Sequence, residues 1–479
     1  MHQCLRTILM DFRPIFSHQS AHVCFLLVML GFILRFDTLG ISSTVRWLGL
    51  APFAYDSLLH FFHASSWSLD HLMSYWLNWC VKHFSLLTIN ERLVCLGDGI
   101  KIPKEATRQP GVVAMHESSG NSAKAERFFG HHIGCIALLT GKLSKIFAVP
   151  ALLEIHEGVN QLRRLSEGDH SLEKDPTVIT RMLGLSLMVA LKIKRPIYGV
   201  FDGLYSTGKA FILARSWKMD DGNPWIHLVV KGKKSYTAYP DQSIKKNEKI
   251  KLWKLFEKTE LFTWTQHPLT FCSICYYATN LYWPPAEGMV RFVLCQQGSK
   301  RFLLMSSDLM LDPITLIQIY SLRTKLEATF NVLKNVIGGF GYRFWSLISP
   351  QLEKKKIPKK KRSQEVATAL TEKQLKKLNQ KLEAIERFIN LAAIVVGILQ
   401  YLAVHFTKQV WKLHHQTSWL RTYSSDIPSE ETVKRTLQAA WIFNSKNRTF
   451  SWAKQIINDY NQKQLNRRKI FNHHTLNIE

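Results

Sequence analysis

The sequence predicts an α/β fold with helical regions on both sides of a strand-rich middle. Between residues 91 and 234, apolar runs typical of strands occur at 92–102, 131–141, 146–156, 195–202 and 225–234, with a helical pattern at 173–192. Residues 235–308 contain short alternating apolar runs separated by Gly, Pro and Asn, as expected of a β-rich segment. Residues 1–90 and those after 371 have helical spacing and few turn signals.

Composition narrows the choice of partner. The chain has 479 residues, 46% of them hydrophobic, so it can bury a sizeable core. Its formal net charge is +27, which favours a polyanionic partner, with nucleic acid first and an anionic membrane surface second. The eight cysteines are scattered, which indicates a reducing compartment. The close pair Cys272 and Cys275 is interpreted as buried structural thiols.

The apolar stretch His22–Phe36 is the best membrane candidate of the sequence. It is too short to span a bilayer, which takes about 20 apolar residues, and Arg35 interrupts it. We therefore expect a buried helix there, no membrane association, and a cytosolic protein that acts on DNA or RNA.

A helix is predicted from Asp312-Pro313, a capping pair, to Gly338-Gly339, where glycine stops it. Its apolar stripe consists of Ile319, Leu322, Leu326, Phe330, Leu333 and Ile337. At about 100° per residue, Tyr320, Arg323, Glu327 and Lys334 fall within about 60° of one another beside that stripe. A solvated face with an Arg323–Glu327 ion pair would explain the charges but not the tyrosine.

Two aspartates offer partners for Glu327. Asp98 and Asp202 each end a strand-like run and are followed by Gly, and strand ends are where α/β folds build their sites. Three converging carboxylates would repel one another unless a cation lay between them. Mg²⁺ suits such a set together with substrate phosphate oxygens, and Arg323 and Lys334 could hold neighbouring phosphates.

The spacing Tyr320-x2-Arg323-x3-Glu327-x6-Lys334 resembles the Tyr-Arg-Glu-Lys signature of DDE-type insertion-sequence transposases. The stretches "LGDGIKI" around Asp98 and "VFDGLYSTGKAF" around Asp202 resemble the family's two catalytic-aspartate strands, and residues 235–308 lie where the family carries a β-rich insertion. The resemblance covers about residues 92–347.

The resemblance implies a ribonuclease-H-like catalytic core. This core would comprise residues 91–234 and 309–347, and the β-rich insertion 235–308 would interrupt it. A helical domain, residues 1–90, would precede the core and could recognise the DNA ends. A basic linker and a helical region, residues 348–479, would follow it. Asp98, Asp202 and Glu327 would bind two Mg²⁺ or Mn²⁺ ions, and Tyr320, Arg323 and Lys334 would contact the DNA backbone. The activity would be cut-and-paste cleavage and strand transfer, without ATP.

The expected partner is double-stranded DNA, both terminal inverted repeats and target, bound by a homodimer in the bacterial cytosol. A tryptophan of the insertion, Trp264 or Trp283, would receive a flipped base or would simply pack. Two alternatives stay open: a metal-dependent nuclease without strand transfer, and a catalytically inactive transposase-derived DNA-binding protein. Inverted repeats flanking the gene would favour the transposase.

Overall fold

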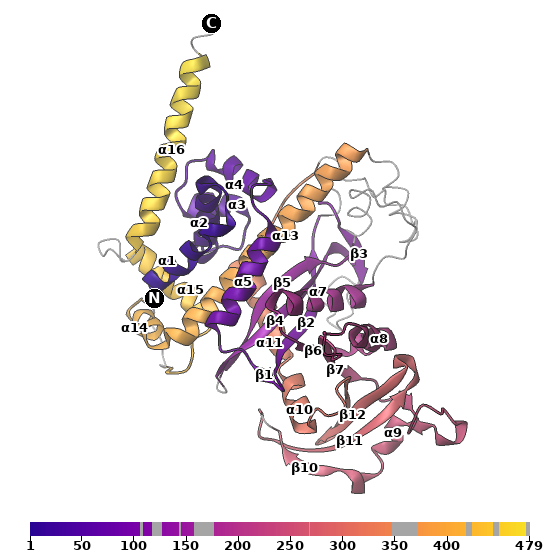
Figure 1. The fold of residues 1–479 in the computed structure, drawn as a ribbon. Helices are drawn as coiled ribbons and strands as arrows, with labels where there is room; N and C mark the ends of the chain where they lie inside the picture. Colours follow the sequence, from indigo (N-terminus) through magenta and orange to yellow (C-terminus); the bar gives the residue numbers. More distant parts are fainter. Residues whose placement is uncertain are drawn as a thin grey trace.

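The computed structural model describes residues 1–105, 109–116, 127–142, 145–157, 177–267, 269–346, 371–417, 424–443 and 450–475. It is a mixed α/β protein built on one large mixed sheet, with helical regions at the N- and C-terminal sides (Figure 1). The α/β class and the helical flanks predicted from the sequence are confirmed. The first part of the predicted basic linker, up to residue 370, and residues 173–176 of the predicted helical pattern lie outside the described residues.

The sheet has 11 strands in the order β10-β11-β12-β13-β7-β6-β2-β4-β3, with β1 paired to β2 and β5 to β4. Its first part consists of β1 (Thr88–Ile89), β2 (Arg92–Pro103), β3 (Val113–His116), β4 (Arg127–Lys142), β5 (Lys145–Ile155), β6 (Ile197–Phe201) and β7 (Ile226–Gly232). Strands β2, β6 and β7 are mutually parallel, whereas β4 runs antiparallel to β2 and β5 antiparallel to β4.

Helices connect the parallel strands. Between β5 and β6 lies α7 (Val178–Ile193), whose N-cap is Thr177. Between β6 and β7 lie the short η2 (Gly203–Tyr205) and α8 (Gly208–Ser216). The apolar character of these strands has a simple cause, since β6 is buried along its whole length between its neighbours.

The β-rich segment extends the same sheet rather than forming a separate one. It contains β8 (Thr237–Ala238), η3 (Lys246–Glu248), β9 (Ile250–Lys251), α9 (Leu252–Leu255), η4 (Thr259–Leu261), β10 (Thr263–Gln266), β11 (Ser273–Trp283), η5 (Pro284–Ala286), β12 (Gly288–Gln297) and β13 (Lys300–Ser306). Strand β13 pairs with β7, so the antiparallel meander β10–β13 continues the sheet; β8 and β9 pair only with each other. All eight cysteines are free; Cys275 is buried as predicted, but Cys272 is exposed.

The N-terminal region is helical. It contains α1 (His2–Asp11), η1 (Arg13–Ile15), α2 (Gln19–Leu34), α3 (Ile41–Trp47), α4 (Ala54–His63) and α5 (Leu69–His83). Helix α2 is buried over nearly its whole length, which confirms the prediction of a buried helix at His22–Phe36.

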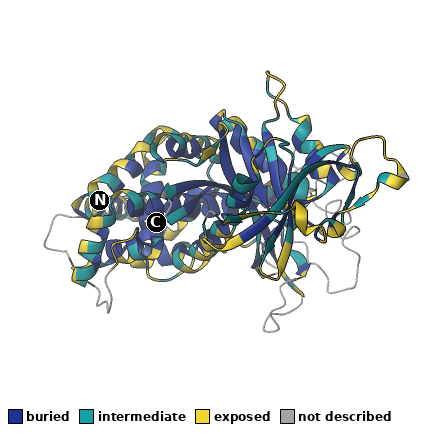
Figure 2. Ribbon diagram, turned by 90° about the horizontal axis from the view of Figure 1, so that it is seen from below, coloured by how far each residue is buried: buried dark blue, intermediate teal, exposed yellow. Residues whose placement is uncertain are grey.

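Among the described residues, one helix is long and apolar enough to cross a membrane, namely α13 (Glu372–His405), but 83% of its apolar window is buried inside the protein. Figure 2 shows the buried residues gathered through the middle of the sheet and the helices against it. Polar side chains of α13 reach the edge strand β5: Asn390 bonds both the N–H and the C=O of Leu153, and Glu386 accepts from the N–H of Ile155. This helix therefore closes a sheet edge, where unpaired backbone groups would otherwise be buried.

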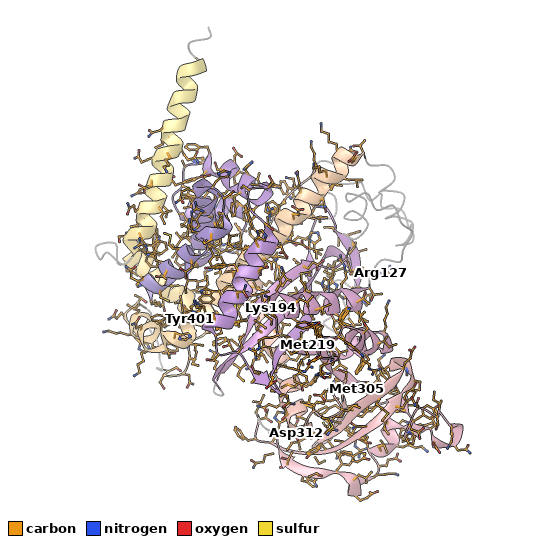
Figure 3. The ribbon with its side chains drawn as sticks, in the orientation of Figure 1. Arg127, Lys194, Met219, Met305, Asp312 and Tyr401 are labelled. Carbon is orange, nitrogen blue, oxygen red and sulfur yellow. The ribbon has the colours of Figure 1, made fainter. Side chains whose placement is uncertain are left out.

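The predicted helix from Asp312 to Gly338 is broken into segments. Asp312, labelled in Figure 3, caps α10 (Pro313–Ser321), and the chain bends before α11 (Thr324–Asn331), which passes into a π-helical turn, η6 (Val332–Ile337). The predicted ends are confirmed, and all six residues of the apolar stripe are buried. The single continuous helix was wrong. At the bend, the Ser321 hydroxyl donates to the Ile317 carbonyl, a bond that favours helix bending.

The C-terminal helices α14 (Thr407–Thr417), α15 (Glu430–Phe443) and α16 (Ser451–Thr475) lie beside the N-terminal helices, and α16 projects from the body of the molecule (Figure 1). Two buried cations meet at the end of η6. Arg35, at the end of α2, donates to the carbonyls of Ile337 and Gly338, and Lys434 of α15 donates to the carbonyl of Val336. Gly338 has a φ of +70°, and a Cβ there would lie 2.5 Å from the backbone of Thr38.

Candidate functional site

Asp98 and Asp202 are neighbours on two parallel strands. The ladder between β2 and β6 ends at the pair Leu96–Val200, and each aspartate lies two residues farther along its strand. Asp202 is the first residue after β6, as predicted. Asp98 differs from the prediction because it does not end its strand. Strand β2 continues to Pro103 through its pairing with β4, so Asp98 lies inside it, at the point where only the parallel partner stops.

The loop after Asp202 is held by hydrogen bonds. Asp202 Oδ1 accepts from the N–H of Leu204 and so caps η2. Tyr236, at the start of the β-rich segment, donates its hydroxyl to the carbonyl of Ser206 at 2.7 Å. Sequence reasoning did not identify Tyr236, because its role depends on a contact across 30 residues.

Arg323 joins two carboxylates from different parts of the chain. Its Nη1 lies 3.0 Å from Asp98 Oδ2, and its Nη2 lies 2.7 Å from Glu327 Oε1. The side chains of Arg323 and Asp98 are about one-fifth exposed, whereas that of Glu327 is 55% exposed. Arg323 is the N-cap of α11, and the residue predicted to hold phosphate contacts carboxylates of β2 and α11 in this structure.

Burial and the neighbouring charges shift the pKa values of Asp98 and Arg323. Burial raises the pKa of Asp98 to about 6; the charges of Asp202 and Glu327 add to the increase, while the N–H of Gly99 and Arg323 oppose it. Burial lowers the pKa of Arg323, but Asp98, Tyr320 and Glu327 raise it overall. Asp98 therefore interacts electrostatically with both other acids, and one guanidinium only partly compensates for the crowding.

Tyr320 and Lys334 differ in their relation to this cluster. Tyr320 is partly buried beside Arg323; its pKa is raised by burial first and also by Asp202 and Asp98. Lys334 is exposed on η6. Within the described ranges, neither a hydrogen bond nor an ion pair joins Lys334 to the acids. The structure thus brings together Asp98, Asp202, Glu327, Arg323 and Tyr320, and leaves Lys334 outside the cluster.

The described residues contain no group of three or more His, Cys, Asp or Glu side chains arranged to hold a metal ion. The Oδ1 of Asp98 accepts from the N–H of Gly99 at 2.8 Å, and its Oδ2 accepts from Arg323 at 3.0 Å. The donor chemistry still suits a hard divalent cation, because the three acids supply only carboxylate oxygens and their mutual repulsion favours a positive charge between them.

The two candidate tryptophans have opposite surroundings. Trp283 is 3% exposed and packs against Phe211 and Tyr236, so it is a core residue and cannot receive a base in this conformation. Trp264, on the edge strand β10, is 72% exposed.

The turn after β10 contacts the segment formed by α10, α11 and η6, which carries the Tyr-Arg-Glu-Lys spacing and is called the signature helix below. His267 Nδ1 accepts from the N–H groups of Leu269 and Thr270, so its Nε2 carries the proton and donates to the Ser321 hydroxyl at 2.9 Å. The hairpin that bears Trp264 is therefore attached at the bend between Tyr320 and Arg323.

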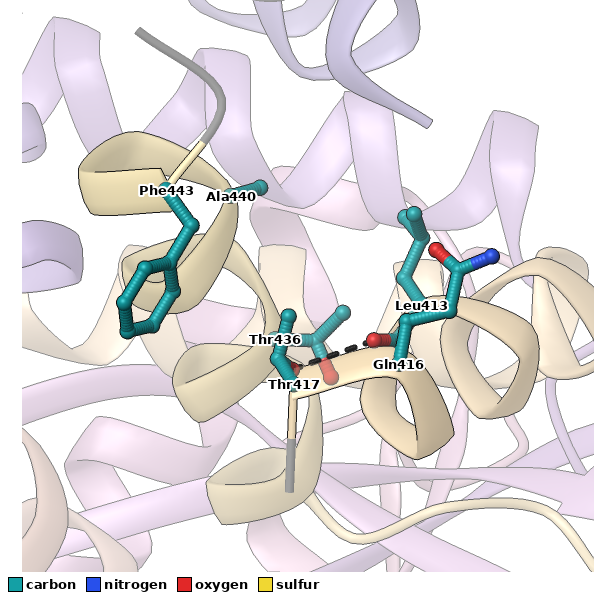
Figure 4. Close-up of a pocket in the computed structure, with 6 residues that line it drawn as sticks. All are labelled: Leu413, Gln416, Thr417, Thr436, Ala440 and Phe443. Atoms are coloured by element: carbon teal, nitrogen blue, oxygen red, sulfur yellow. Dashed lines mark hydrogen bonds between the residues drawn. The ribbon is translucent and has the colours of Figure 1, made fainter.

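A separate hollow of about 360 Å³ lies between α14 and α15 (Figure 4). Its lining consists of Leu413, Gln416, Thr417, Thr436, Ala440 and Phe443. None of these side chains ionises, and the hydroxyls of Thr417 and Thr436 donate to carbonyls of their own helices. The hollow offers no chemistry comparable to that of the acid cluster.

No family model matches this sequence. Among curated proteins, the Fusion glycoprotein F0 of Bovine parainfluenza 3 virus is 30% identical over 105 residues. That match covers 22% of this chain and 18% of the viral protein. A likeness of this extent assigns no family.

Proposed function

We propose that this protein is a DNA transposase that cleaves and joins DNA by metal-dependent phosphoryl transfer on a ribonuclease-H-like core. One observation carries the proposal: Asp98 interacts electrostatically with both Asp202 and Glu327, which lies 229 residues farther along the chain (327 − 98), and Arg323 and Tyr320 lie beside these acids. The signature spacing of residues 320–334 and the formal charge of +27 add support.

The strand arrangement is compatible with that core. The order β5-β4-β2-β6-β7 combines an antiparallel meander with a parallel group, and the two aspartates lie at matching positions of adjacent parallel strands. The β-rich segment between Asp202 and Glu327 extends the sheet away from the acids and returns to the signature helix through His267.

Each residue has a proposed task. Asp98, Asp202 and Glu327 would hold the divalent cations, Mg²⁺ or Mn²⁺. When bound, these ions would activate a water or 3′-hydroxyl and stabilise the leaving oxygen of an in-line displacement. Arg323 and Tyr320 would position the phosphodiester backbone, and Lys334 would bind a phosphate farther along the helix. Trp264 would stack on an unpaired base.

The first test replaces each acid separately by its amide: Asp98→Asn, Asp202→Asn and Glu327→Gln. The substrate is DNA carrying the sequences that flank the gene, with Mg²⁺ or Mn²⁺. We expect each variant to lose about a thousandfold or more in strand cleavage, since each removes several kcal/mol of transition-state stabilisation. Asp220→Asn, which changes an exposed carboxylate after α8, should cleave normally. Full cleavage by any of the three amide variants would refute the proposal.

Product analysis distinguishes the remaining candidates. A transposase joins the cleaved end to a target plasmid, whereas a nuclease leaves only cut DNA. A catalytically inactive DNA-binding protein would bind the ends and yield neither product with any divalent metal.

A further inference from the structure

Arg323 is the cation that the structure places between two of the three acids. Its guanidinium uses separate nitrogens for Asp98 and Glu327, so it bridges one acid of β2 and one acid of α11. Both oxygens of Asp98 are engaged, one by the N–H of Gly99 and the other by Arg323. A divalent ion at that outer oxygen would therefore compete with the guanidinium for the same carboxylate.

Phosphate is the competitor best suited to remove Arg323 from these acids. A guanidinium fork binds phosphate oxygens in the same bidentate way that it binds carboxylates. Arg323 keeps about one-fifth of its side chain exposed, and Glu327 more than half, so a DNA strand can approach them. The strongly basic chain also draws DNA phosphates to its surface.

We propose that Arg323 is an internal counter-ion that holds Asp98 and Glu327 until a DNA phosphate takes it over, so that DNA binding and divalent-cation binding strengthen each other. This inference rests on the proposed function, since it concerns the same acids. It differs from a simple phosphate-binding role, because it assigns Arg323 a second partner when DNA is absent. The coupling must be reciprocal: DNA raises cation affinity by the factor by which the cation raises DNA affinity.

The test measures Mn²⁺ binding to the protein, by electron paramagnetic resonance of the free ion, with and without a mixed-sequence DNA duplex, after subtraction of the ions that the same duplex binds without protein. For the wild type, we expect the duplex to tighten Mn²⁺ binding by about 5- to 150-fold, the usual range of such coupling. Arg323→Gln should bind Mn²⁺ more tightly than the wild type without DNA, and the duplex should add little. Arg323→Lys keeps the charge, but one ammonium cannot reproduce the fork, so its affinity should lie between the two.

Arg435→Gln is the matched control. It removes an arginine that is also paired with a glutamate four residues away, on α15. Its Mn²⁺ binding and its response to the duplex should equal those of the wild type. Circular dichroism and the unfolding midpoint establish that each variant is folded.

Two outcomes would overturn this inference without affecting the proposed function. In the first, Arg323→Gln binds Mn²⁺ no more tightly than the wild type. In the second, the duplex does not change the Mn²⁺ affinity of the wild type. The proposed function would survive both if the amide variants still abolish cleavage. Conversely, if Asp98→Asn and Asp202→Asn bind Mn²⁺ as the wild type does, the ion is elsewhere, and both the inference and the metal role fall.

Discussion

Two tryptophans of the β-rich segment show how surroundings decide the role of a residue. Trp264 and Trp283 lie 19 positions apart (283 − 264) in a segment of one composition. Trp283 is enclosed by Phe211 and Tyr236, and Tyr236 in turn holds the loop after Asp202. Trp264 has most of its surface in solvent. The first therefore contributes to stability, and the second is available to a ligand.

Substitution of the two should separate these roles. Trp264→Ala should leave the free energy of unfolding nearly unchanged but weaken single-stranded DNA binding by about 1–3 kcal/mol, the usual contribution of one stacked base. Trp283→Ala should lower the free energy of unfolding by about 3–5 kcal/mol, since it leaves a large cavity. Urea denaturation and fluorescence anisotropy measure the two quantities. Equal DNA binding by Trp264→Ala and the wild type would remove Trp264 from the interface.

Helix α13 makes side-chain hydrogen bonds to the backbone of β5 at an edge of the sheet. Its side chains Glu386 and Asn390 make the hydrogen bonds that a neighbouring strand would make with β5, and Gln400 donates to the Ala148 carbonyl farther along β5. Hydropathy alone would describe α13 as a membrane span, but these polar positions are satisfied by the sheet edge.

Asn390→Leu should therefore destabilise the protein although it makes the helix more apolar. The substitution removes the side chain that bonds the buried N–H and C=O groups of Leu153. Each group left without a hydrogen bond costs about 1–3 kcal/mol. Ile394→Val, a small packing change on the same helix, should cost only about 0.5–1.5 kcal/mol. Denaturant midpoints at equal protein concentration compare the two. A more stable Asn390→Leu would show that β5 does not depend on this contact.

At the scale of the whole molecule, the N-terminal and C-terminal helical regions meet at the end of η6. Arg35 belongs to the N-terminal helices and Lys434 to the C-terminal ones, and both donate to carbonyls of residues 336–338. Gln438 adds a bond to the carbonyl of Arg35. These contacts tie the segment that bears Glu327 to both flanking regions.

This junction predicts a pH dependence of stability. Burial, followed by the charge of Arg35, lowers the pKa of Lys434 from about 10.5 to about 7 in the folded chain. Between these values the unfolded state binds more protons than the folded state, so the contribution of Lys434 to stability rises with pH. It is lost as the pH falls through about 7. Relative to Lys434→Met, the wild type should gain about 3 kcal/mol between about pH 7 and about pH 10.

Urea titrations across that range measure this difference. Because both proteins share every other titrating group, the difference isolates Lys434. Lys412→Met, at an exposed position of α14, should show no such trend. A flat difference for Lys434→Met would mean that the lysine does not titrate in this range.

The sequence predicted which helices and strands form better than it predicted where a helix breaks or how far a strand extends. The strands near Asp98 and Asp202, the capping residue Asp312 and the terminating Gly338 follow from local chemistry, and the structure has them. The bend before Arg323 was not predicted, because an unbroken apolar stripe hides it. The extension of β2 past Asp98 depends on β4, a partner that no local pattern of β2 specifies.

The candidate site was predictable in composition but not in charge state or contacts. Spacing placed Tyr320, Arg323, Glu327 and Lys334 on one helix face, and the predicted strand ends added Asp98 and Asp202. In the structure, Arg323 pairs with two of the acids, whereas Lys334 lies apart from them on the π-helical turn. The spacing of the residues does not specify these side-chain directions. Tyr236 and His267 act through distant contacts that leave no local signal.

The double anchor on residues 336–338 also sets an order of events during synthesis. Arg35 and Lys434 are 399 positions apart (434 − 35), so a ribosome translates the first of these cations long before the second. A nascent chain that already contains Asp98, Asp202 and Glu327 still lacks the hydrogen bond from Lys434 of α15 to the carbonyl of Val336. The acid carried by α11 gains its complete support only when translation has passed α15, which favours finished molecules over growing ones as the species with an ordered site.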